Sequence, residues 1–134
     1  MIYSGVPERF PKLKFVSVES GIGWIPFYLE ALDYQLVETA PTETSFMSMK
    51  PSEYFKRNFY ASFWFESALG QSLKNCVDSL GADNIMFETD FPHPTCLYPG
   101  PLGFLKRSLA GVDAPIRKKL LQDNAAKLYK VDLS

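Results

Sequence analysis

The hydrophobic positions of the chain follow two patterns: short continuous runs, and longer stretches in which apolar residues recur every three or four positions. Continuous runs near residues 13–18, 59–65 and 84–89 predict strands that are covered on both faces, as in a parallel sheet. The three-and-four spacing over residues 24–37 and 67–80 predicts helices with one apolar side. Strand, helix, strand, helix, strand is the order typical of right-handed βαβ units, so we expect an α/β fold with parallel strands.

The remaining segments are assigned from their turn residues and local periodicity. Residues 1–11 predict the end of a preceding element followed by a turn, and residues 39–50 predict a long irregular loop. A brief helical turn is expected at residues 51–57, and further helices are expected at residues 102–109, 113–121 and 124–130.

Composition and charge narrow the class of protein. The length fits a single domain spanning residues 1–134. Fourteen Lys and Arg against fifteen Asp and Glu, with no basic run, argue against a nucleic-acid partner. Cys76 and Cys96 are too far apart for a CxxC metal site, so we expect reduced thiols in a cytoplasmic protein. Neither a signal peptide nor an apolar stretch of ~18 residues is visible, so no membrane association is expected.

Each predicted strand ends on an acid, namely Glu19, Glu66 and Asp90. If the strands are parallel, their carboxyl ends meet at one rim of the sheet, which is where ligands bind in α/β folds. Acids at strand ends also serve as helix caps or as charge partners, and for each acid taken singly that structural interpretation is equally plausible.

The loop after the third predicted strand carries the sole histidine of the chain. Pro92 and Pro94 flank His93, and because proline lacks the amide donor of a strand ladder, the strand must end by about Phe91. His93 is thereby placed on a constrained loop at the rim, three residues after Asp90.

Four segments together resemble the amidohydrolase-related family, the metal-dependent barrels that include aminocarboxymuconate-semialdehyde decarboxylase. They are residues 10–16, 19–26, 89–93 and 124–129. The resemblance covers essentially the whole chain but matches the carboxyl-terminal part of the family. It implies a partial (β/α)₈ TIM barrel that contains strands six to eight with their helices.

The resemblance also implies roles for particular residues. Asp90 matches an aspartate that binds the metal or serves as base, and His93 matches a histidine that follows it. Glu19 stands where many members have a histidine. The candidate catalytic residues are therefore Asp90, His93 and Glu19, with Asp90 as metal ligand. The candidate substrate-binding residues come from their own positions and not from the family: Trp24 is an aromatic suited to line a pocket, and Glu66 is an acid at a strand end. Trp24 is also expected, more often than not, to be a core aromatic.

Two hypotheses about function follow from the resemblance. In the first, the chain is part of a metal-dependent hydrolase or decarboxylase that acts on a small carboxylic acid, with zinc as the expected divalent metal of the complete enzyme. In the second, the chain binds no metal, has no activity of its own and is a fragment or an assembly-dependent half-barrel. The absence of the family's His-x-His pair and of its strand-five histidine favours the second for the chain in isolation.

A partial barrel predicts self-association, because it leaves a strand edge unpaired and apolar side chains uncovered. We expect a homo-oligomer, most simply a twofold dimer. The side chains expected to be left uncovered are Phe15, Val16, Phe63, Phe65, Ile85 and Phe87.

Overall fold

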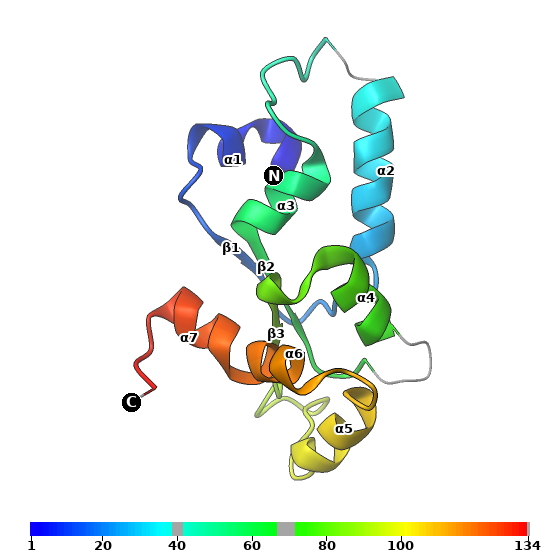
Figure 1. Ribbon diagram of the computed structural model, residues 1–134, viewed down its shortest axis with the longest axis vertical. Helices are drawn as coiled ribbons and strands as arrows, with labels where there is room; N and C mark the ends of the chain where they lie inside the picture. The colour runs from blue at the N-terminus through cyan, green and yellow to red at the C-terminus, as the bar shows by residue number, and fades with distance from the viewer. Residues whose placement is uncertain (39–41, 67–71, 134) are drawn as a thin grey trace.

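A parallel sheet forms the centre of the fold (Figure 1). The computed structural model describes residues 1–38, 42–66 and 72–133. Its strands lie side by side in chain order: β1 (Phe15–Ser17), β2 (Phe59–Phe63) and β3 (Ile85–Phe87). Both neighbouring pairs are parallel, with Phe15 beside Phe59 and Ala61 beside Ile85. The predicted parallel arrangement is confirmed, although each strand is shorter than predicted.

Helical segments precede the first strand, fill the connections between the strands and follow the last one. Their bounds are η1 Ile2–Ser4, α1 Val6–Arg9, α2 Ile25–Glu38, α3 Pro51–Asn58, α4 Ser72–Leu80, η3 Ala82–Asn84, α5 Pro101–Ser108, α6 Ala114–Lys118, η4 Lys119–Asp123 and α7 Asn124–Tyr129. The predicted helices at 24–37 and 102–109 are confirmed to within one residue at each end. The first part of the helix predicted at 67–80 lies outside the described residues. None of the helices in the described ranges is long and apolar enough to span a bilayer.

The carboxyl-terminal helices differ from the prediction of two separate helices at 113–121 and 124–130. Segments α6, η4 and α7 follow one another without a break, and η4 is a π-helical turn. Leu120 in this turn is buried in the core, and Asn124, which follows it, is also buried. A single π turn does not change the three-and-four spacing enough to be visible in the sequence.

The hydrophobic core lies between one face of the sheet and the helices. Side chains alternate along a strand, so Ala61 and Phe63 point to the same face, and their ladder partners Ile85 and Phe87 join them there. Ala61, Phe63 and Ile85 are fully buried in a cluster with the inner sides of α2, α3 and α4. Burying each large apolar side chain stabilises the fold by roughly 1.5–3 kcal/mol.

This packing corrects the prediction of an uncovered sheet. Phe63 and Ile85 are not exposed to solvent, because the helices of the chain itself cover them. Phe15, Val16 and Phe87 are half-buried. Among the six side chains named in that prediction, Phe65 is the exposed one, at 56%.

Three buried asparagines join the amino-terminal ends of the strands. The Asn58 side-chain amide donates to the carbonyl oxygens of Pro11 and Leu13 ahead of β1, at 3.0 and 2.7 Å. Asn84 donates to Lys56 and Phe59 at the start of β2, and Asn124 donates to Ala82 and Ile85 at the start of β3. Asn58 and Asn84 therefore each join the entry of one strand to the helical segment that leads into the next strand. Asn124 joins the entry of β3 to the helical segments that follow β3.

The first residues form the short helical segments η1 and α1, where the sequence predicts the end of a preceding element followed by a turn. The Tyr3 hydroxyl donates to the carbonyl oxygen of Leu32 in α2. In α1, the Glu8 carboxylate accepts hydrogen bonds from the hydroxyls of Tyr54 and Ser48, and these bonds lower the pKa of Glu8. Because α1 has four residues, it is too short to produce a periodic pattern and is held by these tertiary contacts.

Removing the Asn124 amide should weaken the fold. In Asn124→Ala the buried carbonyl oxygens of Ala82 and Ile85 lose their donors, at a cost of about 1–3 kcal/mol in the free energy of unfolding. Urea unfolding followed by circular dichroism measures it. The control is Gln122→Ala, an exposed position in the preceding turn, for which we expect a change within about 0.5 kcal/mol. Equal stability of the two variants would show that the amide bonds do not hold β3.

The two cysteines should react very differently with thiol reagents. Cys76 is 2% exposed and donates to the Ile22 carbonyl oxygen; burial, helped by the charge of Glu66, raises the pKa of its thiol to about 11. Cys96 is half-buried. Mass spectrometry after maleimide labelling at pH 8 should find one label per native chain, on Cys96, and a second after unfolding in urea. Rapid labelling of native Cys76 would contradict the packing described here.

Candidate functional site

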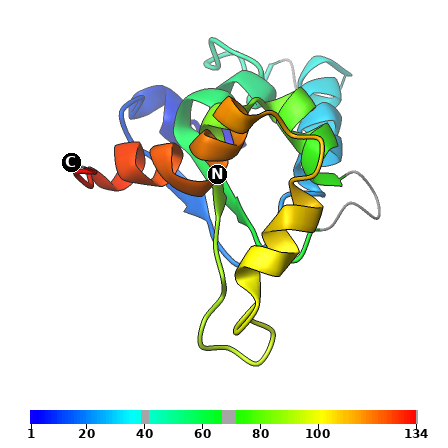
Figure 2. The ribbon, with the colours of Figure 1, turned by 60° about the horizontal axis from the view of Figure 1, so that its bottom comes forward.

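The segments that follow the three strands gather at one end of the sheet, which lies at the bottom of Figure 1. The segment between β3 and α5 projects farthest from this end (Figure 2). Because all strands run in the same direction, residues that follow β1 and β3 are brought to a shared rim, although they lie about seventy positions apart in the chain.

Asp90 is the central hydrogen-bond acceptor of this rim. Its side chain is 4% exposed. Its Oδ1 atom lies 2.7 Å from Nδ1 of His93, and its Oδ2 atom accepts a hydrogen bond of 2.7 Å from the Thr95 hydroxyl. The His93 amide also donates to the Asp90 carbonyl oxygen at 2.9 Å. The loop therefore folds around the Asp90 carboxylate and presents the His93 ring, which is 56% exposed, to solvent.

Glu19 approaches the same pair from the segment after β1. Its Oε1 atom lies 3.5 Å from Nδ1 of His93, and its amide donates to the Glu88 carboxylate at 2.9 Å. Glu19 and Asp90 both have left-handed backbone conformations, with φ of 56° and 60°. This conformation is uncommon for residues other than glycine and is typical of functional sites, where surrounding contacts maintain it. Glu19 follows the end of β1 by two residues and Asp90 follows the end of β3 by three, and both carboxylates lie beside His93.

The hydrogen bonds and charges at this rim shift the pKa values of Asp90 and His93 in opposite directions. Hydrogen bonds from Thr95 and then from His93 lower the pKa of Asp90. The hydrogen bond to Asp90, the charge of Asp90 and the charge of Glu19 raise the pKa of His93. The rim therefore favours an ionised Asp90 beside a protonated imidazole, which keeps its proton to a higher pH than a free histidine does.

The donor set of this rim fits a divalent cation. One ligand atom from each of Glu19, Asp90 and His93 lies within 4.8 Å of the other two. Carboxylate oxygens and imidazole nitrogens are the protein ligands that zinc and manganese accept, and a catalytic site keeps a further position open for water or substrate. The carboxylates of Glu19 and Asp90 therefore suit a catalytic metal, with the His93 ring beside them.

Glu66 lies at the same end of the sheet but apart from these three side chains. Its carboxylate is buried and accepts hydrogen bonds from the amides of Ile22 at 2.5 Å and of Trp64 at 3.2 Å. A side chain at Gly21, whose φ is +65°, would collide with this carboxylate, so the turn after β1 requires glycine there. Glu66 thus holds the turn that carries Glu19, and its contact with a substrate stays a prediction.

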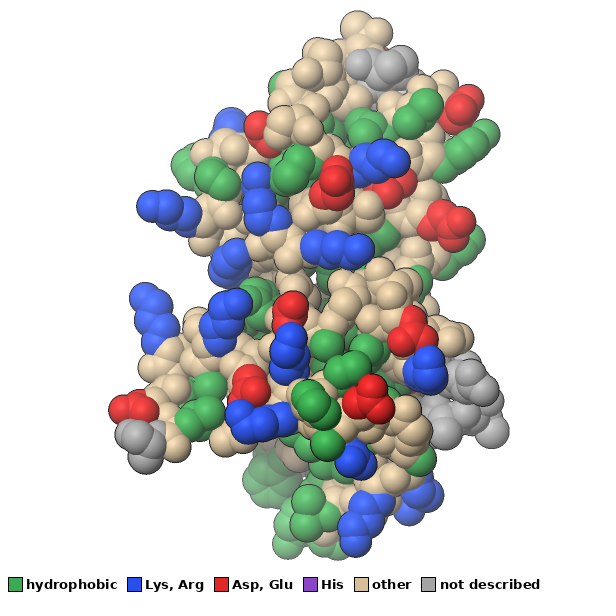
Figure 3. All heavy atoms as spheres, viewed as in Figure 1, with side chains coloured by type: hydrophobic (Ala, Val, Ile, Leu, Met, Phe, Trp, Pro, Cys, Tyr) green, Lys and Arg blue, Asp and Glu red, His purple; other side chains and the backbone are tan. Residues whose placement is uncertain are grey.

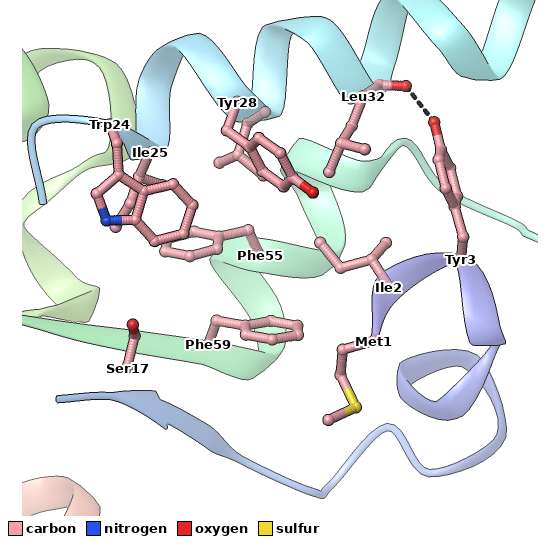
Figure 4. Close-up of a pocket in the computed structure, with 11 residues that line it drawn as sticks. Met1, Ile2, Tyr3, Ser17, Trp24, Ile25, Tyr28, Leu32, Phe55 and Phe59 are labelled. Atoms are coloured by element: carbon pink, nitrogen blue, oxygen red, sulfur yellow. Dashed lines mark hydrogen bonds between the residues drawn. The ribbon is translucent and has the colours of Figure 1, made fainter. Parts of the chain in front are cut away.

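Trp24 lies at the start of α2 and is 46% exposed, so it is not the core aromatic that its type favours. Its indole NH donates to the carbonyl oxygens of Ser20 and Gly21. The ring lines an apolar cavity of about 280 Å³ between η1, β1, α2 and α3, together with Tyr28 and Phe59 (Figure 4). Substrate binding by Trp24 remains a prediction.

Two site residues were not among the sequence candidates. Thr95 fixes the Asp90 carboxylate, and Glu88 holds the Glu19 backbone. Strand alternation predicts that Glu88 and Asp90 share a face, so Glu88 was within reach of sequence analysis. No sequence signal marks Thr95, because its contact depends on how the proline-rich loop folds.

Comparison with known proteins gives this rim a family. A family model described as amidohydrolase matches residues 1–131. The gamma-resorcylate decarboxylase of Polaromonas sp. strain JS666 is 29% identical to the chain over 131 residues, which are 96% of the chain and 38% of the relative.

Two solved structures show the same fold. The 5-carboxyvanillate decarboxylase of Sphingomonas paucimobilis has a TM-score of 0.76 and 29% identity, over 98% of this chain and 38% of that one. A dihydroxybenzoic acid decarboxylase from Polaromonas sp. JS666, crystallised with manganese and 2-nitroresorcinol, has a TM-score of 0.75 and 26% identity, over 99% and 38%. The chain thus spans about two fifths of these relatives and is the partial TIM barrel that the sequence predicts. Because the family model covers nearly all of it, the chain belongs to the amidohydrolase family.

Proposed function

We propose that this chain supplies the carboxyl-terminal part of the active site of a metal-dependent decarboxylase or hydrolase that acts on a small hydroxylated aromatic carboxylic acid. The observation that carries the proposal is the convergence of Glu19, Asp90 and His93 within 4.8 Å at the carboxyl end of parallel strands. The relatives named for decarboxylation of aromatic acids support the reaction class and the substrate class.

In this proposal the carboxylates of Asp90 and Glu19 hold the metal. A divalent cation would supply Lewis-acid stabilisation of the negative oxygens of the substrate. Family resemblance favours zinc, whereas the relative with bound manganese favours manganese, so both ions are candidates. The buried Glu66 acts by positioning, since it holds the turn on which Glu19 lies.

His93 carries the proton of the reaction. When a ring carboxyl group leaves as CO₂, the carbon that loses it must take up a proton. The His93 Nδ1 atom is engaged by Asp90, so Nε2 is the nitrogen that faces outward to a substrate and delivers the proton. Trp24 is the aromatic side chain proposed to stack on the substrate ring.

The alternative is that the chain has no turnover by itself. His93 is the single histidine of the sequence, so the chain contains neither the His-x-His pair nor the strand-five histidine that the family resemblance associates with strands outside this sequence. Under this alternative the rim is complete only when the remaining barrel strands are present. The small-molecule substrate, the cytoplasmic location and the single-domain organisation remain parts of the proposal; the two free cysteines support the location.

Asp90→Asn should weaken metal binding. Isothermal titration of the chain with Mn²⁺ and with Zn²⁺ should show a loss of affinity of at least ~10-fold, because a charged ligand is replaced by a neutral amide. The control is Asp113→Asn, which removes an exposed carboxylate ahead of α6 that makes no capping hydrogen bond. Equal affinities in the two variants would reject Asp90 as a metal ligand. A folded wild-type chain that binds neither ion would favour the alternative in which the rim binds metal only with the remaining barrel strands.

Turnover should require the rest of the barrel. We expect the chain alone, with Mn²⁺ and 2,6-dihydroxybenzoate, to release no measurable CO₂. A fusion of the amino-terminal part of the Polaromonas gamma-resorcylate decarboxylase to this chain should release it. In that fusion, His93→Gln should lower the rate by roughly 10²–10⁴ while the Mn²⁺ affinity stays within about threefold. Turnover by the chain alone would reject the assembly-dependent alternative, and full activity of the His93→Gln fusion would reject His93 as proton donor.

A further inference from the structure

A hollow lined by basic side chains lies at the amino-terminal end of the sheet, where the end of α3, the segment η3 and the helix α7 contribute to its walls. Its volume is about 500 Å³, within the ~300–1,000 Å³ of small-molecule sites. Figure 3 shows Lys and Arg side chains gathered above and below the narrow middle of the molecule, between α3 and α7. The basic hollow is defined here by Lys14, Lys56, Arg57, Tyr60, Asp83 and Lys127.

The basic hollow concentrates positive charge in a chain whose net charge is -1. Four of its six defining side chains are cationic, and Asp83 is the anionic one. The Asp83 carboxylate lies 2.5 Å from Nζ of Lys119, which does not line the hollow, so its negative charge is already compensated. Clustered charge of one sign in a concave surface attracts ions of the opposite sign. The hollow therefore favours an anionic ligand.

Some of this charge has a structural explanation. The Lys14 ammonium donates to the carbonyl oxygen of Arg57, and the Arg57 guanidinium donates to that of Pro7. Cations in the last turn of a helix also offset the helix dipole, as Lys56 does in α3 and Lys127 does in α7. Within the part of the chain that the structure describes, however, the ammonium groups of Lys56 and Lys127 have no hydrogen-bond or ion-pair partner, and both side chains are exposed. Two ammonium groups from two helices therefore remain available at one hollow.

Tyr60 provides an observation that helix dipoles do not explain. It is 7% exposed and lines the basic hollow, yet its hydroxyl has no hydrogen-bond partner among residues 1–38, 42–66 and 72–133. Across the same ranges, every fully sealed polar side-chain atom has a partner, so this hydroxyl must keep access to solvent. Buried tyrosines usually pair their hydroxyl. The Tyr60 hydroxyl is therefore a donor that a ligand in the hollow can use.

The available donors fit a phosphate group. Two ammonium groups and one phenol hydroxyl line the same hollow, and lysine is a common phosphate ligand. A phosphate group carries roughly two negative charges on three acceptor oxygens, so it can accept from all three donors, whereas a carboxylate has one charge and two oxygens. The positive charge is confined to the hollow and does not form the basic stripe of a nucleic-acid binder. We propose that the basic hollow binds the phosphate group of a small phosphorylated molecule.

This site is separate from the rim that carries the candidate metal ligands. Lys14 and Asp83 precede β1 and β3, whereas Glu19 and Asp90 follow them, so the two sites lie at opposite ends of the sheet. A ligand in the hollow contacts α3, α7 and the segments that enter the strands. Because these contacts exist only in the folded chain, the ligand should raise Tm. The inference does not depend on the metal site or on turnover.

Pyrophosphate should bind to the chain, and Lys127→Gln should weaken this binding. Isothermal titration in physiological salt with EDTA, which removes metal ions, should show one inorganic pyrophosphate per wild-type chain and at least ~5-fold lower affinity in the variant. The matched control is Lys106→Gln, which removes the same charge from an exposed position on α5 outside the hollow and should change the affinity less than about twofold. A folded wild-type chain that binds no pyrophosphate, or equal weakening by the two substitutions, would overturn the proposal.

Tyr60→Phe distinguishes a phosphate site from attraction by charge alone. The variant keeps the ring and removes a hydroxyl that has no partner in the described ranges, so Tm of the free chain should change little. Pyrophosphate affinity should fall roughly 3–10-fold, because one donor to the ligand is lost. Malonate, a dianion of similar size with carboxylate groups, should bind the wild-type chain at least ~10-fold more weakly than pyrophosphate. Unchanged pyrophosphate affinity in Tyr60→Phe, or equal affinity of the wild-type chain for malonate, would reject a phosphate site.

Discussion

The buried asparagine contacts at the amino-terminal end of the sheet are the constraint on which the rest of the structure depends. Asn58, Asn84 and Asn124 are nearly inaccessible to solvent, and each donates two hydrogen bonds to backbone carbonyl groups near a strand entry. A buried carbonyl group without a donor is costly, so these contacts select one alignment of the segments. Because the strands are parallel, the segments that follow them come to one end of the sheet.

The two ends of the sheet consequently have different roles, one in stability and the other in the candidate site. At the amino-terminal end, neutral amides satisfy buried carbonyl groups, which is a contribution to stability. At the carboxyl-terminal end, Glu19 and Asp90 adopt left-handed conformations and direct their charges at His93. Glu66 links the two roles, since it is buried like the asparagines but holds the turn that carries Glu19. Strain at the rim is tolerated because the rest of the sheet is rigidly aligned.

The exposed apolar side chains do not lie on the sheet face that a partial barrel was expected to uncover. The helices of the chain cover Phe63 and Ile85, so this sheet face is not the exposed apolar surface that a partial barrel predicts. Exposed aromatic side chains are found instead on the outer side of α2, opposite the side of the helix that packs in the core. One side of α2 places Ile25 and Leu29 in the core, and the opposite side leaves Phe27 and Tyr34 exposed to solvent.

The sequence by itself determined the parallel α/β class, because continuous apolar runs and three-and-four spacing report directly which local structure can be buried. It also determined the chemistry of the rim: Asp90 and His93 lie three residues apart in a loop that two prolines constrain, and strand direction alone brings Glu19 to the same end. Tertiary structure decided the rest. Thr95 reaches Asp90, Glu66 turns inward beneath Gly21, and residues 1–11 fold against α2 and α3, because these contacts join segments whose distance in space is not encoded in local periodicity. The π turn that carries Leu120 into the core and the outward aromatics of α2 were likewise decided by packing, since a hydrophobic pattern states which residues avoid water but not which partner covers them.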